Sequence, residues 1–345
     1  MRILVIRLSA MGDVALTLPV LKAFVTEYPG IDIVLVTRKA YGVFFREIQA
    51  VDLFTPDFKK RHSGFAGIFR LFMDLRKRGG FDCVIDLHDV LRSKIIGFLF
   101  RISGTRVVRI DKGRKEKNDL IRGRRKTELK HTVERYSETF SRAGFPLVPR
   151  KGRCIHPGKE AQKKANALLS GTNVSLNIGI APFAKHPLKQ WPTERMVQLI
   201  RMISDRRGGG VRFWLFGGED ERERLAEIEM AGKDIISLCG TLTLEEELAV
   251  IGELDFMIAM DSSNMHMAVL AGTKVLSIWG GTDPSAGFGA WGEPPEHSVY
   301  ISAEELDCRP CTVYGKGTCR RGDFACMMRL SPEKVFNRLV ELGFI

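Results

Sequence analysis

The chain has 345 residues and a formal net charge of +12, with 44% hydrophobic and 27% charged residues. This composition is ordinary for a soluble globular protein, and the length suffices for about two domains. No membrane-spanning helix is expected, because no apolar run reaches the roughly 18–20 residues that cross a bilayer. The apolar start at residues 1–6 is too short for a signal peptide, so we expect a cytoplasmic protein.

Short apolar runs alternate with helical patterns through the first half of the chain. Residues 2–8 and 31–37 are predicted strands on either side of a helix over 14–27. The turn at 9–13 lacks the G-x-G-x-x-G dinucleotide fingerprint. It ends with Asp13 at the carboxyl end of a strand, where α/β sheets bind ligands, so Asp13 is either a helix cap or a catalytic base over a cleft. Further predicted elements are strands at 82–87 and 106–110 and helices at 91–102 and 131–143.

A strongly basic segment interrupts this half. Residues 112–130 hold nine Lys or Arg and three acidic residues, and we expect an irregular loop in the first domain. Such a patch can bind nucleic acid, anionic lipid or an acidic small molecule, or it can be a solvated loop. No stacked-aromatic pattern or nucleic-acid motif accompanies it, which favours anionic lipid or acidic glycan.

The second half repeats the alternation after a linker. Residues 144–160 carry three prolines and three glycines with little periodicity. We therefore expect domains at 1–150 and 151–330, each a doubly wound parallel sheet, followed by a terminal helix within 331–345. Predicted strands lie at 177–181, 211–216, 234–238, 254–260 and 274–279, and predicted helices at 193–206, 219–231 and 244–252.

One stretch of the second half, residues 261–284, has the pattern of a ligand-binding βαβ unit. An apolar run ends at Asp261, a short polar loop follows, and a helix then runs to Gly272 before the next apolar run. The helix begins with small hydroxyl residues, and its positive end suits a phosphate. The alternative is that these residues only cap the helix. The residues concerned are Asp261, Ser262, Ser263, Asn264 and His266.

The seven cysteines fall into two groups. Cys83, Cys154 and Cys239 are isolated and are expected to be buried. The other four lie in a stretch with few apolar residues, which predicts a structural role. Free thiols are the expected state in the cytosol, while zinc ligation and disulfides are the alternatives. These four are Cys308, Cys311, Cys319 and Cys326.

Four motifs, in order along the chain, resemble those of one family. They are R-x-S-x-x-G-D with its later proline at 7–19, K-x-W-P at 189–192, L-F-G-G-E-D-E-R-E-R-L-A-E-I at 215–228, and D-S-S-N-M-H through T-D-P at 261–284. Together they resemble glycosyltransferase family 9, the bacterial heptosyltransferases of lipopolysaccharide core assembly. The C-x-P-C start of the cysteine cluster is also similar to one in some members.

The resemblance implies the GT-B fold, which is two Rossmann-like domains facing across a cleft. It implies an inverting transfer with Asp13 as the base, and a nucleotide diphosphate whose charge Lys189 and a helix N-terminus offset without metal or cofactor. Glu221, or the nearby Glu219, matches the position that binds the donor ribose. We expect donor contacts from Glu221, Asp261, Ser262, Ser263, Asn264 and His266, and acceptor contacts from Arg122, Arg124, Arg125 and Lys126.

The expected donor is ADP-heptose and the expected acceptor a lipopolysaccharide core or lipid A, with peripheral contact at the inner membrane and no nucleic acid. The chain departs from the family at Ser263-Asn264, where many members have Gly-Leu, and in a second lysine, Lys185. Two alternatives stand beside this reading. One is a nucleotide-sugar epimerase of similar fold. The other is a non-enzymatic nucleic-acid or membrane-binding protein, in which Asp13 and Lys189 would be incidental.

Overall fold

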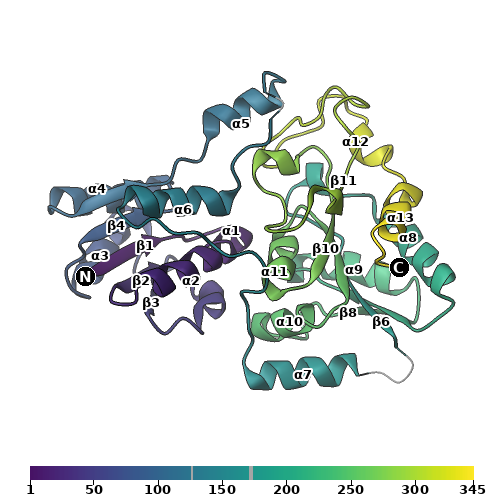
Figure 1. Ribbon diagram of the computed structural model, residues 1–345, viewed down its shortest axis with the longest axis horizontal. Coiled ribbons are helices and arrows are strands. Elements are labelled where there is room, and N and C mark those ends of the chain that lie inside the picture. Colours follow the sequence, from purple (N-terminus) through teal and green to yellow (C-terminus); the bar gives the residue numbers. More distant parts are fainter. Residues whose placement is uncertain (126, 171–173) are drawn as a thin grey trace. The chain divides into compact units, whose positions relative to one another are not determined.

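The computed structural model describes residues 1–125, 127–170 and 174–345. Lys126, one of the expected acceptor contacts, lies outside the described residues. The chain forms two compact units, the first made of residues 1–113 and 132–151 and the second of 114–131 and 152–345. Each unit contains one parallel sheet with helices on both faces (Figure 1). None of the helices in the described ranges is long and apolar enough to cross a membrane.

The first unit is built on a five-stranded parallel sheet in the order β3-β2-β1-β4-β5. Its central strands are Val-, Ile- and Leu-rich because parallel strands are buried on both faces. The direction of strand addition reverses beside β1, where Ile6 pairs with Val36 on one side and with Asp86 on the other. The strands are β1 (Arg2–Ile6), β2 (Asp32–Val36), β3 (Val51–Phe54), β4 (Cys83–Asp86) and β5 (Arg106–Arg109).

Helices cover both faces of this sheet. Right-handed crossovers put the helices that follow β1 on one face, and the helices that follow β3 and β4 on the other. On the second face the rings of Phe72 and Phe100 meet edge to face with centroids 4.9 Å apart. The helices are α1 (Met11–Ala15), α2 (Leu18–Glu27), α3 (Gly64–Arg76), α4 (Leu91–Ile102) and α6 (Thr132–Arg142), with a 3-10 turn η1 (Lys39–Phe45).

Two local features of this unit differ from the sequence-based expectations. The helix expected over 14–27 is divided into α1 and α2, because Pro19 in the first turn of α2 has no N–H to continue a hydrogen-bonded helix from α1. Asp13 accordingly lies in the first turn of α1 and not in the preceding turn. β3 and α3 also occupy a region, residues 38–81, for which no element was predicted.

The second unit contains a six-stranded parallel sheet in the order β11-β10-β9-β6-β7-β8. Here the order reverses between β6 and β9, where Ala181 pairs with Ala259. Open α/β sheets bind ligands at such a switch point, beyond the carboxyl ends of the strands. The strands are β6 (Leu176–Ala181), β7 (Val211–Leu215), β8 (Ile235–Ser237), β9 (Phe256–Met260), β10 (Lys274–Ile278) and β11 (Ser298–Val299).

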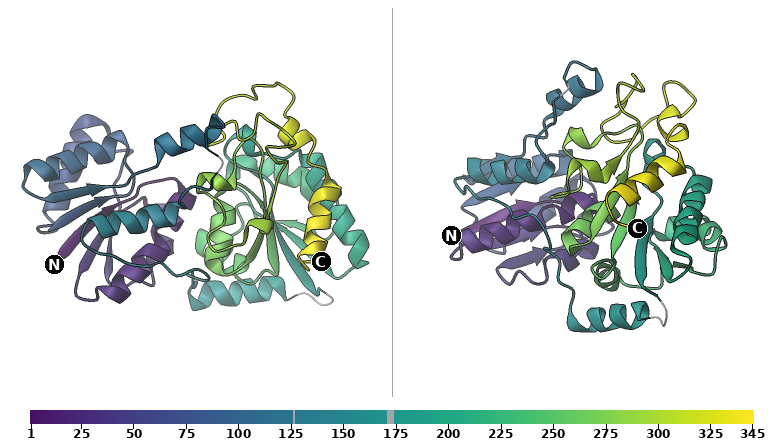
Figure 2. Two further views of the ribbon diagram at one scale, coloured as in Figure 1. Left: turned by 45° about the horizontal axis from the view of Figure 1, so that its top comes forward. Right: turned by 45° about the vertical axis from the view of Figure 1, so that its right-hand side comes forward.

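The helices of the second unit agree with the expected alternation, with two additions: α7, which begins inside the expected linker, and the short α12 at the end of the cysteine cluster. The terminal helix α13 packs along α8 (Figure 2). Between β11 and α13 the described chain has little regular structure. The helices are α7 (Lys159–Leu169), α8 (Thr193–Arg207), α9 (Arg222–Glu229), α10 (Leu244–Ile251), α11 (Ser263–Ala271), α12 (Ala325–Met328) and α13 (Pro332–Glu341).

The basic segment requires a correction. It was expected to be an irregular loop of the first domain, but it contains helix α5 (Arg114–Ile121), and residues 114–131 belong to the second unit. Leu120 and Leu129 bury their side chains against Ala286. The Leu129 N–H also donates to the Ser285 carbonyl at 2.8 Å. These apolar residues stand among nine basic ones, so charge dominates the sequence pattern and hides the anchor.

Candidate active site

In the second unit, Lys189 and Asp261 meet at the switch point of the sheet. Lys189 follows β6 and Asp261 follows β9, and the two strands are neighbours. The Lys189 Nζ lies 2.8 Å from the Asp261 Oδ2. Thr282 donates its hydroxyl to the same carboxylate oxygen at 2.8 Å, and the Asp261 side chain is buried. Asp261, expected as a donor contact, is therefore the residue that orients the Lys189 ammonium.

The lysine loop is held by close backbone packing. The Gly281 N–H donates to the Leu188 carbonyl at 2.8 Å. A Cβ placed on Gly280 would lie only 2.7 Å from that same carbonyl oxygen, so the approach requires glycine there. Trp191, in the K-x-W-P motif, is buried and donates its indole N–H to the Leu330 carbonyl at 3.0 Å. The motif thus places Lys189 through a buried anchor on one side and a glycine contact on the other.

The N-terminus of α11 follows directly after Asp261. Ser262 is its N-cap residue, yet its side chain makes no capping hydrogen bond, and its buried hydroxyl has no partner among the described residues. The alternative interpretation, in which this residue only caps the helix, therefore does not describe Ser262 in the structure. Ser263 and Asn264 form the first turn, where the backbone N–H groups of a helix are free to bind an anion. His266, in the same turn, is buried.

The electrostatic environment around this loop is positive. Burial lowers the pKa of His186, and the charges of Lys189, Lys316 and Lys185 lower it further. A neutral imidazole beside three ammonium groups is the arrangement expected where a polyanion, and not a cation, is the ligand. Lys185, the extra lysine noted in the sequence, is exposed and belongs to this group of charges.

The structure also distinguishes the two candidate ribose ligands. Glu219 is exposed and forms a two-point ion pair with Arg222, at 2.8 and 2.7 Å. Glu221 instead accepts a hydrogen bond from the Gly218 N–H at 2.9 Å, and burial raises the pKa of its carboxyl group. Because Glu221 lies in the 3-10 turn Glu219–Glu221 of the loop after β7 and is not engaged in an ion pair within the described chain, it retains acceptor capacity for hydroxyl groups.

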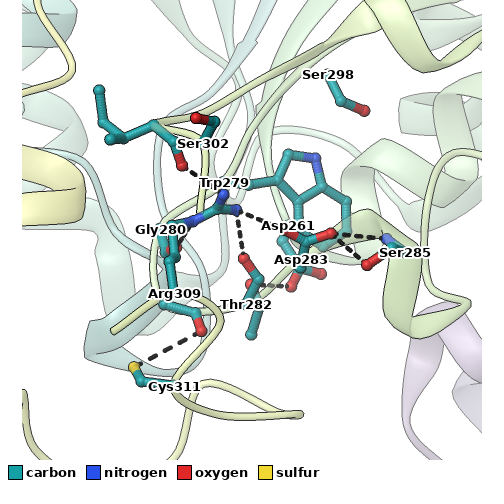
Figure 3. A network of polar contacts seen from close by, with 12 residues as sticks. Asp261, Trp279, Gly280, Thr282, Asp283, Ser285, Ser298, Ser302, Arg309 and Cys311 are labelled. Atoms are coloured by element: carbon teal, nitrogen blue, oxygen red, sulfur yellow. Dashed lines mark hydrogen bonds and ion pairs between the residues drawn. The ribbon is translucent and has the colours of Figure 1, made fainter. Parts of the chain in front are cut away.

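Arg309 is a residue of this site that sequence reasoning missed. Its guanidinium donates to the carbonyls of Gly280 (2.5 Å), Thr282 (2.7 Å) and Ile301 (2.6 Å), and it lies 3.3 Å from the Asp283 carboxylate. Figure 3 shows this buried network around the loop that follows β10. The loop carries Thr282, the partner of Asp261, so Arg309 supports Lys189 indirectly. The feature of the sequence that could have drawn attention to Arg309 is its position between the first two clustered cysteines.

The four clustered cysteines line one small cavity together with Arg309. All seven cysteines of the chain are free thiols, and Cys83, Cys154 and Cys239 are buried as expected. Burial raises the pKa of Cys326 to about 11 and raises those of Cys308 and Cys311. Within the described ranges, no group of three or more His, Cys, Asp or Glu side chains is arranged to hold a metal ion.

The segment that carries the four clustered cysteines, residues 308–326, also has a role in positioning Lys189. A Cβ on Gly315, which has a left-handed φ of 76°, would lie 2.6 Å from the Cγ of Lys189. The segment therefore lies against the aliphatic part of the lysine side chain.

In the first unit, Asp13 is held by a buried arginine. The Arg7 Nη2 lies 2.7 Å from the Asp13 Oδ2, and the Asp13 side chain is 32% exposed, so one side of the carboxylate faces solvent. Arg7 also donates to the Leu87 carbonyl at 2.6 Å and lies over the Tyr136 ring. The Tyr136 hydroxyl donates to the Asp13 backbone carbonyl at 3.1 Å. Asp13 is thus a fixed, partly exposed carboxylate at the switch point of its sheet.

His88 is a second residue that sequence reasoning missed. It follows β4, the neighbour of β1, and its Nε2 lies 3.4 Å from the Ser9 hydroxyl. Burial, with the nearby charges of Arg7 and Lys112, lowers the pKa of His88 to about 3. The ring is therefore neutral at pH 7. A histidine directly after a predicted strand, on the same sheet edge as Asp13, was the signal available in the sequence.

The expected acceptor residues of the basic segment lie in the second unit. Arg122, Arg124 and Arg125 are all exposed at the end of α5. The Arg124 guanidinium lies 4.0 Å from the Asp119 carboxylate, and Arg125 donates to the Thr127 hydroxyl at 2.8 Å. They form an exposed cationic surface of that unit.

Comparisons with known proteins give the family. The model of glycosyltransferase family 9 (heptosyltransferase) matches residues 68–318. The lipopolysaccharide heptosyltransferase 1 of Pseudomonas aeruginosa is 27% identical, over 98% of this chain and 97% of its own length. A solved family 9 glycosyl transferase from Veillonella parvula has a TM-score of 0.76 at 21% identity, covering 99% of this chain and 97% of that one. The Escherichia coli ADP-heptose lipopolysaccharide heptosyltransferase II gives a TM-score of 0.72 at 17% identity, covering 100% and 99%.

The solved structures confirm the expected α/β fold class, with the two Rossmann-like units of GT-B enzymes. The family match extends over more than half of the chain and includes the Lys189 loop, Glu221 and the Asp261 stretch. The first motif, at 7–19, lies before the matched range, but the alignment with the Pseudomonas relative covers nearly the whole chain. The chain belongs to glycosyltransferase family 9.

Proposed function

We propose that the chain transfers heptose from ADP-heptose to an acceptor of the lipopolysaccharide core or lipid A type, with inversion at the anomeric carbon. Family membership supports the reaction type, and the names of the relatives support the sugar and the acceptor. The observation that carries the proposal is the Lys189 ammonium, fixed by Asp261 beside the N-terminus of α11. A lysine and free N–H groups together make a site for a diphosphate.

On this proposal the second unit binds the donor. As the bond between the anomeric carbon and the diphosphate breaks, negative charge grows on the departing ADP. Lys189 and the N–H groups of Ser263 and Asn264 stabilise that charge, and no metal is required. Glu221 accepts hydrogen bonds from the ribose hydroxyls, because the Gly218 N–H holds its carboxylate in the loop after β7.

The first unit supplies the base. Asp13 takes the proton of an acceptor hydroxyl while that oxygen forms the new bond to the anomeric carbon. Arg7 fixes the carboxylate in one orientation, which leaves its exposed side for the acceptor. Because the displacement is a single step, the configuration at the anomeric carbon is inverted.

The proposal also covers the charge of the acceptor and the place in the cell where the enzyme works. Lipopolysaccharide acceptors are rich in phosphate and carboxylate, which suits the exposed arginines Arg122, Arg124 and Arg125. Such an acceptor is anchored in lipid, so the enzyme works as a peripheral protein at the cytoplasmic face of the inner membrane.

A direct test combines binding and turnover. ADP-heptose should raise the melting temperature more than GDP- or UDP-sugars do, since a ligand that binds only the folded state stabilises it. With a heptose-free core acceptor the protein should release ADP and extend the acceptor, and EDTA should change little. Lys189→Ala should weaken ADP-heptose binding and slow transfer. Conversion of the sugar nucleotide without acceptor would instead indicate an epimerase, and loss of transfer in EDTA with rescue by magnesium would contradict the metal-free account.

A further inference from the structure

Two neighbouring helices of the first unit expose an unusual number of large apolar side chains. Across the described residues, eleven large hydrophobic side chains are exposed, and six of them lie on α3 and α4. Phe65, at 78%, is among the most exposed. Monomeric proteins rarely leave a group of this kind on one face without a partner. We call these six residues the α3–α4 patch: Phe65, Phe69, Met73, Leu91, Phe98 and Ile102.

The spacing puts the patch on the outer face of both helices. Phe65, Phe69 and Met73 recur every four residues along α3, while its other apolar face, including Ile68 and Leu71, is buried on the sheet. The exposed apolar residues of α4 also lie on one face of their helix, because they are spaced by seven and then four residues. The two helices lie side by side on one face of the sheet (Figure 1). Helices that are apolar on both faces require a second apolar environment.

Positive charge surrounds this apolar surface. Within α3 and α4 there are five Lys or Arg residues and a single acidic residue, Asp74. Asp74 is largely buried and accepts two hydrogen bonds from Arg61, at 2.6 and 2.7 Å, so it does not offset the outer charges. Arg76 and Arg101 each lie three residues beyond a patch residue, on the same side of their helix. The five basic residues are Arg70, Arg76, Arg92, Lys94 and Arg101. Two of them have neighbours outside the patch, because Lys94 lies 3.4 Å from the Asp89 carboxylate and Arg92 lies over the Phe58 ring.

We propose that the α3–α4 patch docks the first unit on the surface of an anionic lipid bilayer. Aromatic and aliphatic side chains flanked by Lys and Arg are the combination that binds at a bilayer interface, where the chains enter the headgroup region and the cations meet acidic lipids. A second copy of the chain is disfavoured as the occupant, because a symmetric contact would place the two cationic faces against each other. The choice of a membrane as the partner rests on the proposed function with its lipid-linked acceptor. The existence of the patch does not depend on that proposal.

The test is sedimentation of the purified protein with vesicles. The wild type should bind vesicles of mixed phosphatidylcholine and phosphatidylglycerol, bind pure phosphatidylcholine weakly, and detach as salt rises. A Phe69→Ser/Phe98→Ser variant should lose about tenfold in vesicle binding, since it removes two exposed rings that would enter the headgroup region of the bilayer. A matched Val148→Ser/Met230→Ser variant, which removes two exposed apolar residues from elsewhere, should bind as the wild type does.

The readouts separate this inference from the proposed function. Both variants should keep the wild-type melting temperature and the wild-type rate on a water-soluble acceptor fragment, so a lost vesicle signal is not a folding or catalytic defect. Equal vesicle binding by the wild type and the Phe69/Phe98 variant would overturn the inference. A wild-type dimer that this variant dissociates would also overturn it and would assign the patch to a protein interface. Absence of transfer with vesicle binding retained would refute the proposed function alone.

Discussion

Asp13 is a carboxylate that is held in place and is still partly exposed to solvent. Its Oδ2 is held by Arg7 at 2.7 Å, while about a third of the side chain is exposed. Asp13→Asn keeps the shape and one acceptor oxygen for Arg7, but it removes the negative charge that accepts the proton. We expect ADP-heptose binding to stay within about twofold and transfer to fall at least about a hundredfold, which is the usual contribution of a general base. Single-turnover kinetics beside calorimetric titration would check this, and near-normal turnover would exclude Asp13 as the base.

His88 gives the first unit a defined dependence on pH. Its folded-state pKa, about 3, lies below the value of about 6.5 in an unfolded chain, so the folded state disfavours the protonated ring. The stability contribution is therefore complete above pH 6.5 and is lost as pH falls from 6.5 toward 3, by up to about 1.4 kcal/mol per pH unit. His88→Gln should flatten the pH dependence of the unfolding free energy in that window. Parallel curves for both proteins would contradict this assignment.

At the scale of elements, the loop after β10 depends on a single buried cation. Arg309→Met removes the donor from three buried carbonyls and removes the cation that pairs with Asp283. We expect a loss of about 3 kcal/mol or more in the free energy of unfolding, because unsatisfied buried polar groups are costly. Arg321→Met is the matched control, since among the described residues this exposed arginine forms an ion pair only with the nearby Asp323, and it should change little. Denaturant titration of both variants would decide the point.

Most strands and helices could be predicted from the sequence because their apolar periodicity is strong and local. Helix α4 matches the predicted range 91–102, and β6, β7, β9 and β10 lie within two residues of prediction. The region around α3 was harder to interpret because its helix is apolar on both faces, so a one-sided periodicity is weak. α5 was missed because its apolar anchor, Leu120, is surrounded by charge.

The candidate site likewise contains some residues that could be predicted from the sequence and others that could not. Lys189, Asp261 and the N-terminus of α11 could be identified because their motifs are continuous in sequence. The roles of Arg309 and His88 come from tertiary contacts with residues 27–29 and 79 positions away, and their local sequence signals do not identify those partners. Asp261 was identified as a site residue, but its partner, the Lys189 ammonium, is visible only in three dimensions.

At the scale of the whole molecule, the basic segment can be tested as an acceptor surface. Arg122→Ser/Arg124→Ser/Arg125→Ser removes three exposed charges from the second unit. We expect the KM for a phosphorylated acceptor to rise about tenfold or more, with the salt dependence of KM reduced, because charge-assisted contacts are lost. ADP-heptose affinity should not change. A loss of nucleotide affinity would assign this surface to the donor, in line with its membership of the second unit.

The chain path through the two units has a consequence for synthesis. The first unit is interrupted after Gly113 and resumes only at Thr132, so it is assembled from two separate stretches of chain. Tyr136, whose hydroxyl bonds the Asp13 carbonyl and whose ring lies under Arg7, belongs to the later stretch. A nascent chain that has emerged from the ribosome only as far as residue 113 therefore holds Asp13 and Arg7 but lacks the tyrosine that fixes them. The surroundings of Asp13 are completed only once Tyr136 has been made, and a protein split at residue 113 would have to restore them by association of the two fragments.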